Sequence, residues 1–280
     1  MKLSYRMSCV ALALGLTACG GNQSTTTETA PTATQTDSYV SPLPDSAPVV
    51  KVATTGTMPP FSFQDEYGNM VGIDIDSIRA IGEAAGFKVE FYQEPWQNLF
   101  SSVMSGQRDL AISGISYKPE RAEMYSLSDS YFINPSAIMY KDTTMAVDGL
   151  YSLRGKRVAT MTDSKQEDQM KEVGGYAELV SLPSTFLLYE ALMQGKVDAV
   201  LQDEPLLKYT ALNYPQHAVI IKPYESPEDP LSQQVVMMAK DNTKLLEQVN
   251  EGIAKIKADG KMQAIEAKWF KSHDLNSAGN

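Results

Sequence analysis

The chain has 280 residues, of which 43% are hydrophobic and 9% aromatic, a composition typical of a folded protein with about two ordinary domains. Its 34 acidic residues outnumber its 24 Lys and Arg residues, which gives a formal net charge of −10. This charge argues against a nucleic-acid binder, because phosphate backbones are bound by clustered basic residues. The two cysteines are Cys9 and Cys19, so the rest of the chain can form neither a disulfide nor a cysteine metal cluster.

The first nineteen residues have the layout of an export signal. Lys2 and Arg6 precede an apolar run at Met7–Leu16 that is too short to span a bilayer. Small residues then lead to Cys19, and this stretch resembles the lipobox of bacterial lipoproteins, in which the cysteine is acylated and becomes the mature N-terminus. The resemblance implies a signal peptide at 1–18 and lipidation of Cys19. The alternative is a plain secretory signal with an incidental cysteine.

The segment that follows is rich in Thr, Gln, Ser, Ala and Pro and has few large apolar side chains. It cannot bury enough apolar surface to offset the entropy of ordering its backbone. We therefore expect residues 19–48 to form a disordered tether with a reach of roughly 30 Å. No later stretch is apolar enough to span a bilayer, so we expect the lipid to be the attachment to the membrane.

From residue 49 on, short β-branched runs alternate with amphipathic segments, which is typical of an α/β protein. The first half predicts strands at 49–54, 88–92 and 109–113, separated by a helix capped by Asp74 and a helix that ends at Gly106. In such sheets, ligands bind where strands end.

The same alternation begins again after Asp148 and indicates a second, similar half. The predicted elements are strands at 157–161, 197–202, 217–221 and 235–239, helices that begin at Ser164, Ser184 and Pro205, and two final amphipathic helices.

No catalytic motif is present in the sequence. It contains no G-x-G-x-x-G after a strand, no G-x-S-x-G and no H-E-x-x-H. His217 is the one histidine inside the predicted α/β body, and a packed or surface histidine is its simplest interpretation. We therefore predict no catalytic residue, no metal and no cofactor, in a protein that binds its ligand without transforming it.

Several motifs follow one another in an order typical of a single family. They are Pro59–Phe63, Gly72–Asp76, Asp109–Ser116 with Glu120-Arg121, Ser126–Asp129, Leu153–Ala159, Gly195–Asp203 and Lys268–Phe270. With these motifs the chain resembles family 3 of the bacterial solute-binding proteins, the polar amino-acid receptors of ABC importers, over roughly residues 49–270.

The resemblance implies the type II periplasmic-binding-protein fold, with two α/β lobes, two crossing strands that join them and a ligand cleft between them. Lobe 1 would comprise residues 49–136 plus 235–271, lobe 2 would comprise 137–234, and 272–280 would form a tail. Closure of the lobes would be a hinge motion that buries the ligand and strengthens its polar contacts.

The resemblance also implies roles for residues at the strand ends. Arg121 matches the arginine that grips the ligand's α-carboxylate, a task suited to a planar guanidinium fork. Ser113, Gly114 and Ser116 would offer backbone groups and hydroxyls to the same ligand. Asp203 matches the acid that receives the α-ammonium. From the residues alone, Arg121 would be a surface helix arginine and Asp203 a helix cap.

Two further sites would complete the ligand's surroundings. Trp96 matches the aromatic residue that packs on the ligand from lobe 1, although its indole could instead be part of the core. Ser164 and Glu167 form the capping-box pattern S-x-x-E, and the free N–H groups of the helix that begins there suit a carboxylate.

Three positions depart from the family pattern. Lys165 replaces a small residue, Met58 replaces Tyr or Phe, and Thr55 replaces the Asp or Glu of many members. A dibasic side chain needs an acid at the far end of its pocket, and Thr55 cannot provide one. We therefore expect a neutral polar or sulfur-containing ligand side chain, or an acidic one if Lys165 faces it.

Together these implications predict the substrate-binding component of an ABC importer. The protein would be a lipid-anchored monomer of the cell envelope, facing the periplasm or the outer surface of the inner membrane, that delivers an L-amino acid to a permease driven by its ATPase. One alternative is an enzyme on the same fold, similar to cyclohexadienyl dehydratase, which would need a cleft acid such as Glu204 for proton transfer. The other is an amino-acid sensor.

Overall fold

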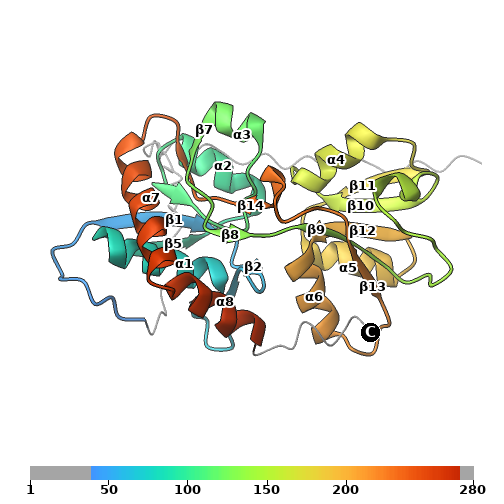
Figure 1. The fold of residues 1–280 in the computed structure, drawn as a ribbon, viewed down its shortest axis with the longest axis horizontal. Helices are drawn as coiled ribbons and strands as arrows, with labels where there is room; N and C mark the ends of the chain where they lie inside the picture. The colour runs from blue at the N-terminus through green and yellow to red at the C-terminus, as the bar shows by residue number, and fades with distance from the viewer. Residues whose placement is uncertain (1–38, 272–280) are drawn as a thin grey trace, which may run out of the picture. The chain divides into compact units, whose positions relative to one another are not determined.

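The computed structural model describes residues 39–271. The predicted signal peptide at 1–18, the lipidation site Cys19, most of the predicted tether and the tail at 272–280 lie outside the described residues. Within the described part, two five-stranded sheets are accompanied by helices, which is the predicted α/β class (Figure 1). No helix in this part is both long and apolar enough to cross a membrane.

The first sheet combines the beginning and the end of the described chain. Its strand order is β5 (Lys88–Gln93), β1 (Val49–Thr54), β6 (Leu110–Ala111), β15 (Met237–Ala239) and β7 (Tyr125–Leu127). β1 is parallel to β5 and β6, whereas β15 is antiparallel to both of its neighbours. The helices of this half, called lobe 1 from here on, are α1 (Ile73–Ala85), α2 (Trp96–Met104), α3 (Pro119–Met124), α7 (Thr243–Ala258) and α8 (Lys261–Lys271).

The second sheet has the order β11 (Glu178–Leu182), β10 (Arg157–Met161), β12 (Ala199–Asp203), β9 (Ser136–Tyr140) and β13 (Ile220–Pro223). β10 is parallel to β11 and β12, and β9 is antiparallel to β12 and β13. The helices of this half, called lobe 2, are α4 (Lys165–Val173), α5 (Thr185–Met193), α6 (Glu204–Asn213) and the 3-10 helix η1 (Leu150–Leu153).

Two short strands connect the lobes. β8 (Phe132–Ile133) leads into lobe 2 and β14 (Gln233–Gln234), after the 3-10 turn η2 (Pro230–Ser232), leads back, and the two pair in antiparallel fashion (Figure 1). A three-stranded sheet of β2 (Thr57–Met58), β3 (Ser62–Gln64) and β4 (Met70–Val71) precedes α1.

The predicted periodicities account for the core of lobe 1. Ile75, Ile78 and Ile81 recur at three-residue spacing in α1 and are fully buried. In β1, Val52 and Ala53 are both fully buried although they are consecutive, because helices cover both faces of a parallel sheet. Burial of this apolar surface is the main stabilising contribution to the lobe.

The prediction that Asp74 caps α1 is wrong. The helix begins at Ile73 with Gly72 at the N-cap position, and Asp74 is fully buried in the first turn. Gly72 has a φ of +131°, and a Cβ at this position would lie 2.0 Å from the carbonyl oxygen of Phe61. Only glycine fits at this position. The helix begins at the next residue, so Asp74 lies in its first turn and not at its cap.

Other predicted elements are confirmed with adjusted ends. The strands at 49–54 and 157–161 have the predicted bounds, and Ser164 and Ser184 each accept a hydrogen bond as N-caps. The strand predicted at 109–113 is shorter because the chain turns at Gly114, which has a φ of +61°. The strands predicted at 197–202, 217–221 and 235–239 lie at 199–203, 220–223 and 237–239, and the helix predicted to begin at Pro205 begins at Glu204.

Residues 39–48 lie against lobe 1. The hydroxyl of Tyr39 donates a hydrogen bond to Glu83 of α1, and the guanidinium carbon of Arg79 is 4.5 Å from the centre of the Tyr39 ring. The carboxylate of Asp45 is 3.5 Å from the ammonium of Lys88. These contacts fix where the N-terminal segment joins the body.

Candidate functional site

A narrow cavity lies between the lobes. Its lining comprises Met58, Trp96, Gly114, Ser116 and Arg121 from lobe 1 and Met161, Ser164, Lys165, Gln166, Gln202 and Asp203 from lobe 2. The lining contains every predicted ligand-binding residue except Thr55 and Ser113. Met161, Gln166 and Gln202 are additional residues that the sequence did not single out.

Thr55 and Ser113 lie behind the cavity wall. Their hydroxyl oxygens are 2.8 Å apart, and the hydroxyl oxygen of Ser62, in β3, is 3.3 Å and 3.2 Å from them. The backbone N–H of Thr55 also donates to Ser113 Oγ, at 3.2 Å. The three hydroxyls thus satisfy one another, and the expectation that Thr55 and Ser113 meet the ligand is not supported by their positions.

The loop after β6 is shaped by a buried carboxylate. The N–H of Gly114 donates to Asp74 Oδ2 at 2.7 Å, and a Cβ at Gly114 would lie 3.3 Å from Gln234 Nε2. Asp74 Oδ1 accepts a hydrogen bond from the Tyr131 hydroxyl at 2.6 Å, and that hydroxyl is 3.2 Å from Gln234 Oε1. Since Gln234 belongs to β14, this network connects the cavity wall to the crossing strands.

Burial dominates the electrostatics of Asp74. It raises the pKa of this carboxyl to about 7, although the hydrogen bonds from Tyr131 and Gly114 act in the opposite direction. The sequence pattern gave no sign of this role, because an acid in the first turn of a helix is usually an exposed one.

Arg121 projects from α3 and is 5% exposed. Its Nη1 donates to the carbonyl oxygen of Ser116 and its Nη2 to that of Asp163, both at 2.8 Å. The guanidinium carbon lies 5.6 Å from the centre of the Trp96 ring and 5.2 Å from that of Phe100. Backbone oxygens and aromatic faces therefore hold the group in place.

The guanidinium of Arg121 is a buried cation. Burial lowers the pKa of Arg121 to about 10, and the negative charges of Asp168, Asp203 and Asp163 oppose this effect. Its hydrogen-bond acceptors among the described residues are carbonyl oxygens, not carboxylates. A bound carboxylate would supply the counter-ion that this environment favours.

The predicted capping box at the start of α4 has a modified form. Ser164 Oγ accepts a hydrogen bond from the N–H of Glu167 at 3.1 Å, as the motif predicts. Glu167 Oε2 accepts from the N–H of Asp163, at 2.8 Å, and not from that of Ser164. Asp163 has a φ of 58°, and the turn it makes brings its carbonyl oxygen to Arg121.

Asp203 ends β12 on the opposite wall and is buried. Gln166 Nε2 donates to its Oδ1 at 2.7 Å, and Lys165 Nζ is 3.8 Å from the same oxygen. Burial raises the pKa of Asp203, while Lys165 and Gln166 lower it. Asp203 occupies the N-cap position of α6, as the alternative interpretation expects, but its side chain makes no capping hydrogen bond to the helix.

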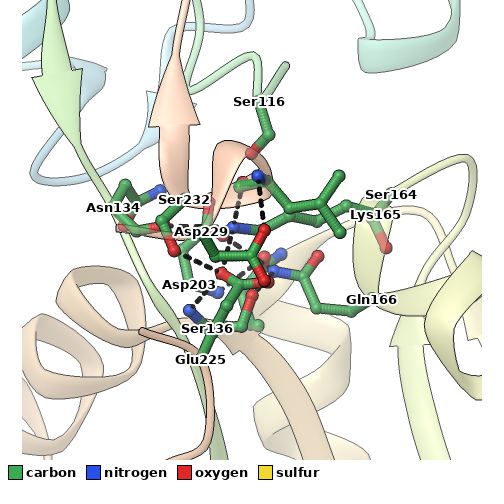
Figure 2. Close-up of polar contacts among 12 residues, drawn as sticks. Ser116, Asn134, Ser136, Ser164, Lys165, Gln166, Asp203, Glu225, Asp229 and Ser232 are labelled. Atoms are coloured by element: carbon green, nitrogen blue, oxygen red, sulfur yellow. Dashed lines mark hydrogen bonds and ion pairs between the residues drawn. The ribbon is translucent and has the colours of Figure 1, made fainter. Parts of the chain in front are cut away.

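The ammonium of Lys165 is held by three acceptors of the protein itself. It donates to Glu225 Oε2 at 2.6 Å and to the carbonyl oxygen of Asn134 at 3.0 Å (Figure 2). It also donates to the carbonyl oxygen of Leu231 at 2.7 Å. Three partners saturate its three N–H donors, so the suggestion that Lys165 selects an acidic side chain is not supported by this geometry. Glu225 was missed because it lies 60 residues away in a loop without a pattern.

Further contacts hold the two lobes together. The ammonium of Lys118, next to α3, forms an ion pair with Asp168 of α4. The rings of Phe63 and Tyr209 lie 6.1 Å apart between centres.

Glu204, considered above as a catalytic acid, pairs with Lys208 at 2.7 Å and is not part of the cavity lining. The described residues contain no group of three or more His, Cys, Asp or Glu side chains that could hold a metal.

Known proteins with similar sequences bind amino acids. Residues 50–272 match the model of the family described as bacterial extracellular solute-binding proteins, family 3. The amino-acid-binding protein AabA of Dichelobacter nodosus is 29% identical over 219 residues, which cover 75% of this chain and 83% of AabA. The L-cystine-binding protein TcyJ of Escherichia coli (strain K12) is 26% identical over 221 residues, which cover 78% of this chain and 81% of TcyJ.

Solved structures show the same fold. A structure described as an ancestral arginine-binding protein bound to glutamine has a TM-score of 0.73 and 30% identity, covering 79% of this chain and 97% of that one. A structure described as an ancestral arginine-binding protein bound to arginine also has a TM-score of 0.73 and 30% identity, covering 79% of this chain and 98% of that one. The predicted fold class, two α/β lobes of the type II periplasmic-binding-protein fold joined by two crossing strands, is thereby confirmed.

Proposed function

The chain belongs to family 3 of the bacterial extracellular solute-binding proteins, and from this we propose that it is the binding component of an ABC importer. It takes up an L-amino acid between its lobes and delivers it to a membrane permease whose ATPase drives transport. The named relatives AabA and TcyJ, an amino-acid-binding and an L-cystine-binding protein, support this proposal.

The observation that carries the proposal is the arrangement of buried charges in the cavity. Arg121 lines one wall as a guanidinium without a hydrogen-bonded carboxylate among the described residues, and Asp203 lines the other wall as a buried acid. The α-carboxylate and α-ammonium of an amino acid have the complementary charges. Closed lobes exclude water from both pairs, which strengthens their attraction.

The rest of the lining favours a neutral ligand side chain. Among the lining residues, Asp203 is the one carboxylate, so a second cation on the ligand would have no counter-ion. Met58, Met161 and Trp96 provide apolar surface. The indole N–H of Trp96 is buried without an acceptor in the described structure, and a polar side chain with an oxygen acceptor would satisfy it. We propose a neutral polar or sulfur-containing side chain.

Ligand capture tests the proposal directly. The purified protein is incubated with an equimolar pool of the twenty common amino acids plus cystine, washed and denatured, and the released molecule is identified by mass spectrometry. We expect one or a few neutral amino acids. Release of no amino acid from a folded sample would contradict the proposed function.

We further propose that the protein is exported and anchored through an acylated Cys19, as the lipobox-like sequence at 16–20 suggests. Acyl chains contribute about 0.8 kcal/mol per buried CH₂, so their loss should release the protein from membranes. In detergent-phase partition of cell extracts, the natural protein should enter the detergent phase and Cys19→Ala should not. Equal partition of both would contradict the anchor.

A further inference from the structure

A buried ion pair lies directly behind the acidic wall of the cavity. The side chains of Lys165 and Glu225 are each 2% exposed, and their Nζ and Oε2 atoms are 2.6 Å apart (Figure 2). Burial of two charges costs free energy that their attraction only partly offsets, so such a pair is seldom kept for stability alone. Its position next to Asp203 suggests a role in ligand binding.

Glu225 occupies a site built for an anion. Besides the ammonium of Lys165, its carboxylate accepts hydrogen bonds from Gln169 Nε2 at 2.9 Å, the N–H of Ser136 at 2.9 Å and Ser232 Oγ at 3.0 Å. Burial opposes ionisation, but Lys165 and these hydrogen bonds outweigh it and lower the pKa of Glu225. Glu225 therefore carries its charge at neutral pH.

Lys165 is shared unequally between two acids. Its Nζ is in hydrogen-bond contact with Glu225, but it is 3.8 Å from Asp203 Oδ1, beyond hydrogen-bond distance. The carbonyl oxygens of Asn134 and Leu231, which flank the crossing strands, hold the ammonium on the Glu225 side. Asp203 accepts a hydrogen bond from the amide of Gln166 and, because the ammonium of Lys165 is not in hydrogen-bond contact with it, can also accept from a ligand.

The ammonium subsite is the place beside Asp203 where the ligand's α-ammonium would bind. The charges of the residues around it balance only when the charge of that ammonium is included. Asp203 and Glu225 supply two negative charges and Lys165 one positive charge, so one negative charge remains for the ligand's ammonium. Without Glu225, Lys165 and Asp203 would neutralise each other, because Coulomb attraction at this separation is strong in a buried site. The ammonium subsite would then be closed by the protein's own lysine.

We propose that Glu225 is a positioning residue, which holds Lys165 away from Asp203 and thereby reserves Asp203 for the α-ammonium of the ligand. This inference rests on the proposed function, since it assumes that the cavity binds an amino acid. It assigns a role to a residue outside the cavity lining that acts through Lys165.

Two variants test the proposal by calorimetry. The probes are the tightest-binding of the twenty common amino acids and cystine, and the carboxylic acid that lacks its α-amino group. Glu225→Gln should weaken the amino acid at least tenfold and leave the des-amino acid within about threefold. The double variant Lys165→Met with Glu225→Gln removes both charges of the buried pair and should bind the amino acid more tightly than Glu225→Gln alone, because no ammonium remains to pair with Asp203.

Glu172→Gln is the matched control, because it removes one exposed negative charge from the same helix, α4, and should bind like the natural protein. Circular dichroism checks the fold of each variant. If Glu225→Gln does not fold, the double variant decides: loss of binding by a folded double variant would show that the cluster is merely structural and overturn the proposal.

Two other results would also overturn it: unchanged binding of the amino acid by Glu225→Gln, or an equal loss of amino acid and des-amino acid. If the natural protein binds no amino acid, the proposed function fails and this inference fails with it. If the natural protein binds and Glu225→Gln binds equally well, only this inference fails.

Discussion

The guanidinium of Arg121 donates a hydrogen bond from Nη2 to the carbonyl oxygen of Asp163, at 2.8 Å, and thereby joins lobe 1 to lobe 2. Asp163 is the one non-glycine residue with a positive φ in the described chain. A residue held in this region costs on the order of 1 to 3 kcal/mol, and such strain is typical of ligand sites. Arg121 thus contacts both lobes in addition to its proposed role as carboxylate receptor.

Arg121→Ala should weaken ligand binding by about 30-fold to several thousand-fold. Removing one partner of a desolvated charge pair costs about 2 to 5 kcal/mol, against roughly 8 kcal/mol for a micromolar ligand. Calorimetry with the captured amino acid measures the effect. Arg121→Lys is the matched variant, because it keeps the charge without the planar fork and should bind more weakly than the natural protein. Affinity near that of the natural protein in Arg121→Ala would remove this residue from the site.

Asp203→Asn should weaken binding while the fold is kept. The change removes the negative charge that faces the α-ammonium, but Oδ1 can still accept from Gln166. Because Asp203 makes no side-chain capping bond to α6, the circular dichroism spectrum of the Asp203→Asn variant should match that of the natural protein. A variant that unfolds, or one that binds normally, would count against the proposed role.

The parts of the cavity that the sequence predicted are those carried by short motifs at strand ends. Arg121, Trp96 and Asp203 lie in the lining as the family resemblance implied, whereas the residues alone favoured a surface arginine and a helix cap and allowed a core tryptophan. The prediction that Thr55 lines the cavity is not met, because the hydroxyl of Ser62 contacts that of Thr55. Ser62 lies in a hairpin that the sequence pattern does not predict.

The residues that the sequence missed depend on contacts between distant segments. Glu225 follows β13 in a loop without periodicity, and only the folded chain brings it to Lys165. Gln202 precedes Asp203 in β12, and alternation along a strand predicts that the two side chains point to opposite faces. The strand ends at Asp203, however, and Gln202 Oε1 accepts from the N–H of Asp203 at 2.9 Å, so both reach the cavity.

The stability of the protein should depend on the protonation of Asp74. Burial raises its pKa from 3.8 to about 7, so between these values the folded state binds more protons than the unfolded state. Stability must then fall as pH rises from about 4 through 7. Asp74→Asn lacks this titration, and its melting temperature should decline less between pH 5 and pH 8 than that of the natural protein.

Comparing the two proteins at each pH isolates this effect, because every other titrating group is present in both. Thermal unfolding followed by circular dichroism at pH 5, 6, 7 and 8 gives the two profiles. Parallel profiles would show that Asp74 has no raised pKa. A variant that also loses ligand affinity would show that the hydrogen bond from Gly114 shapes the cavity wall.

Arginine and lysine should bind at least tenfold more weakly than the best neutral amino acid, a difference of about 1.4 kcal/mol. The physical reason is the second cation of these ligands, since Asp203 is the one carboxylate of the lining and Glu225 is already paired with Lys165.

A thermal-shift screen of the twenty common amino acids plus cystine, at one concentration, ranks the ligands by the stabilisation they give. Calorimetry then measures the dissociation constants of the best neutral ligand, arginine and lysine. The ancestral arginine-binding protein whose structure is described as bound to arginine is a suitable reference protein in the same screen. If arginine or lysine gave the largest shift, the cavity would have to contain a counter-ion that the structure does not show, and the proposed selectivity would be wrong.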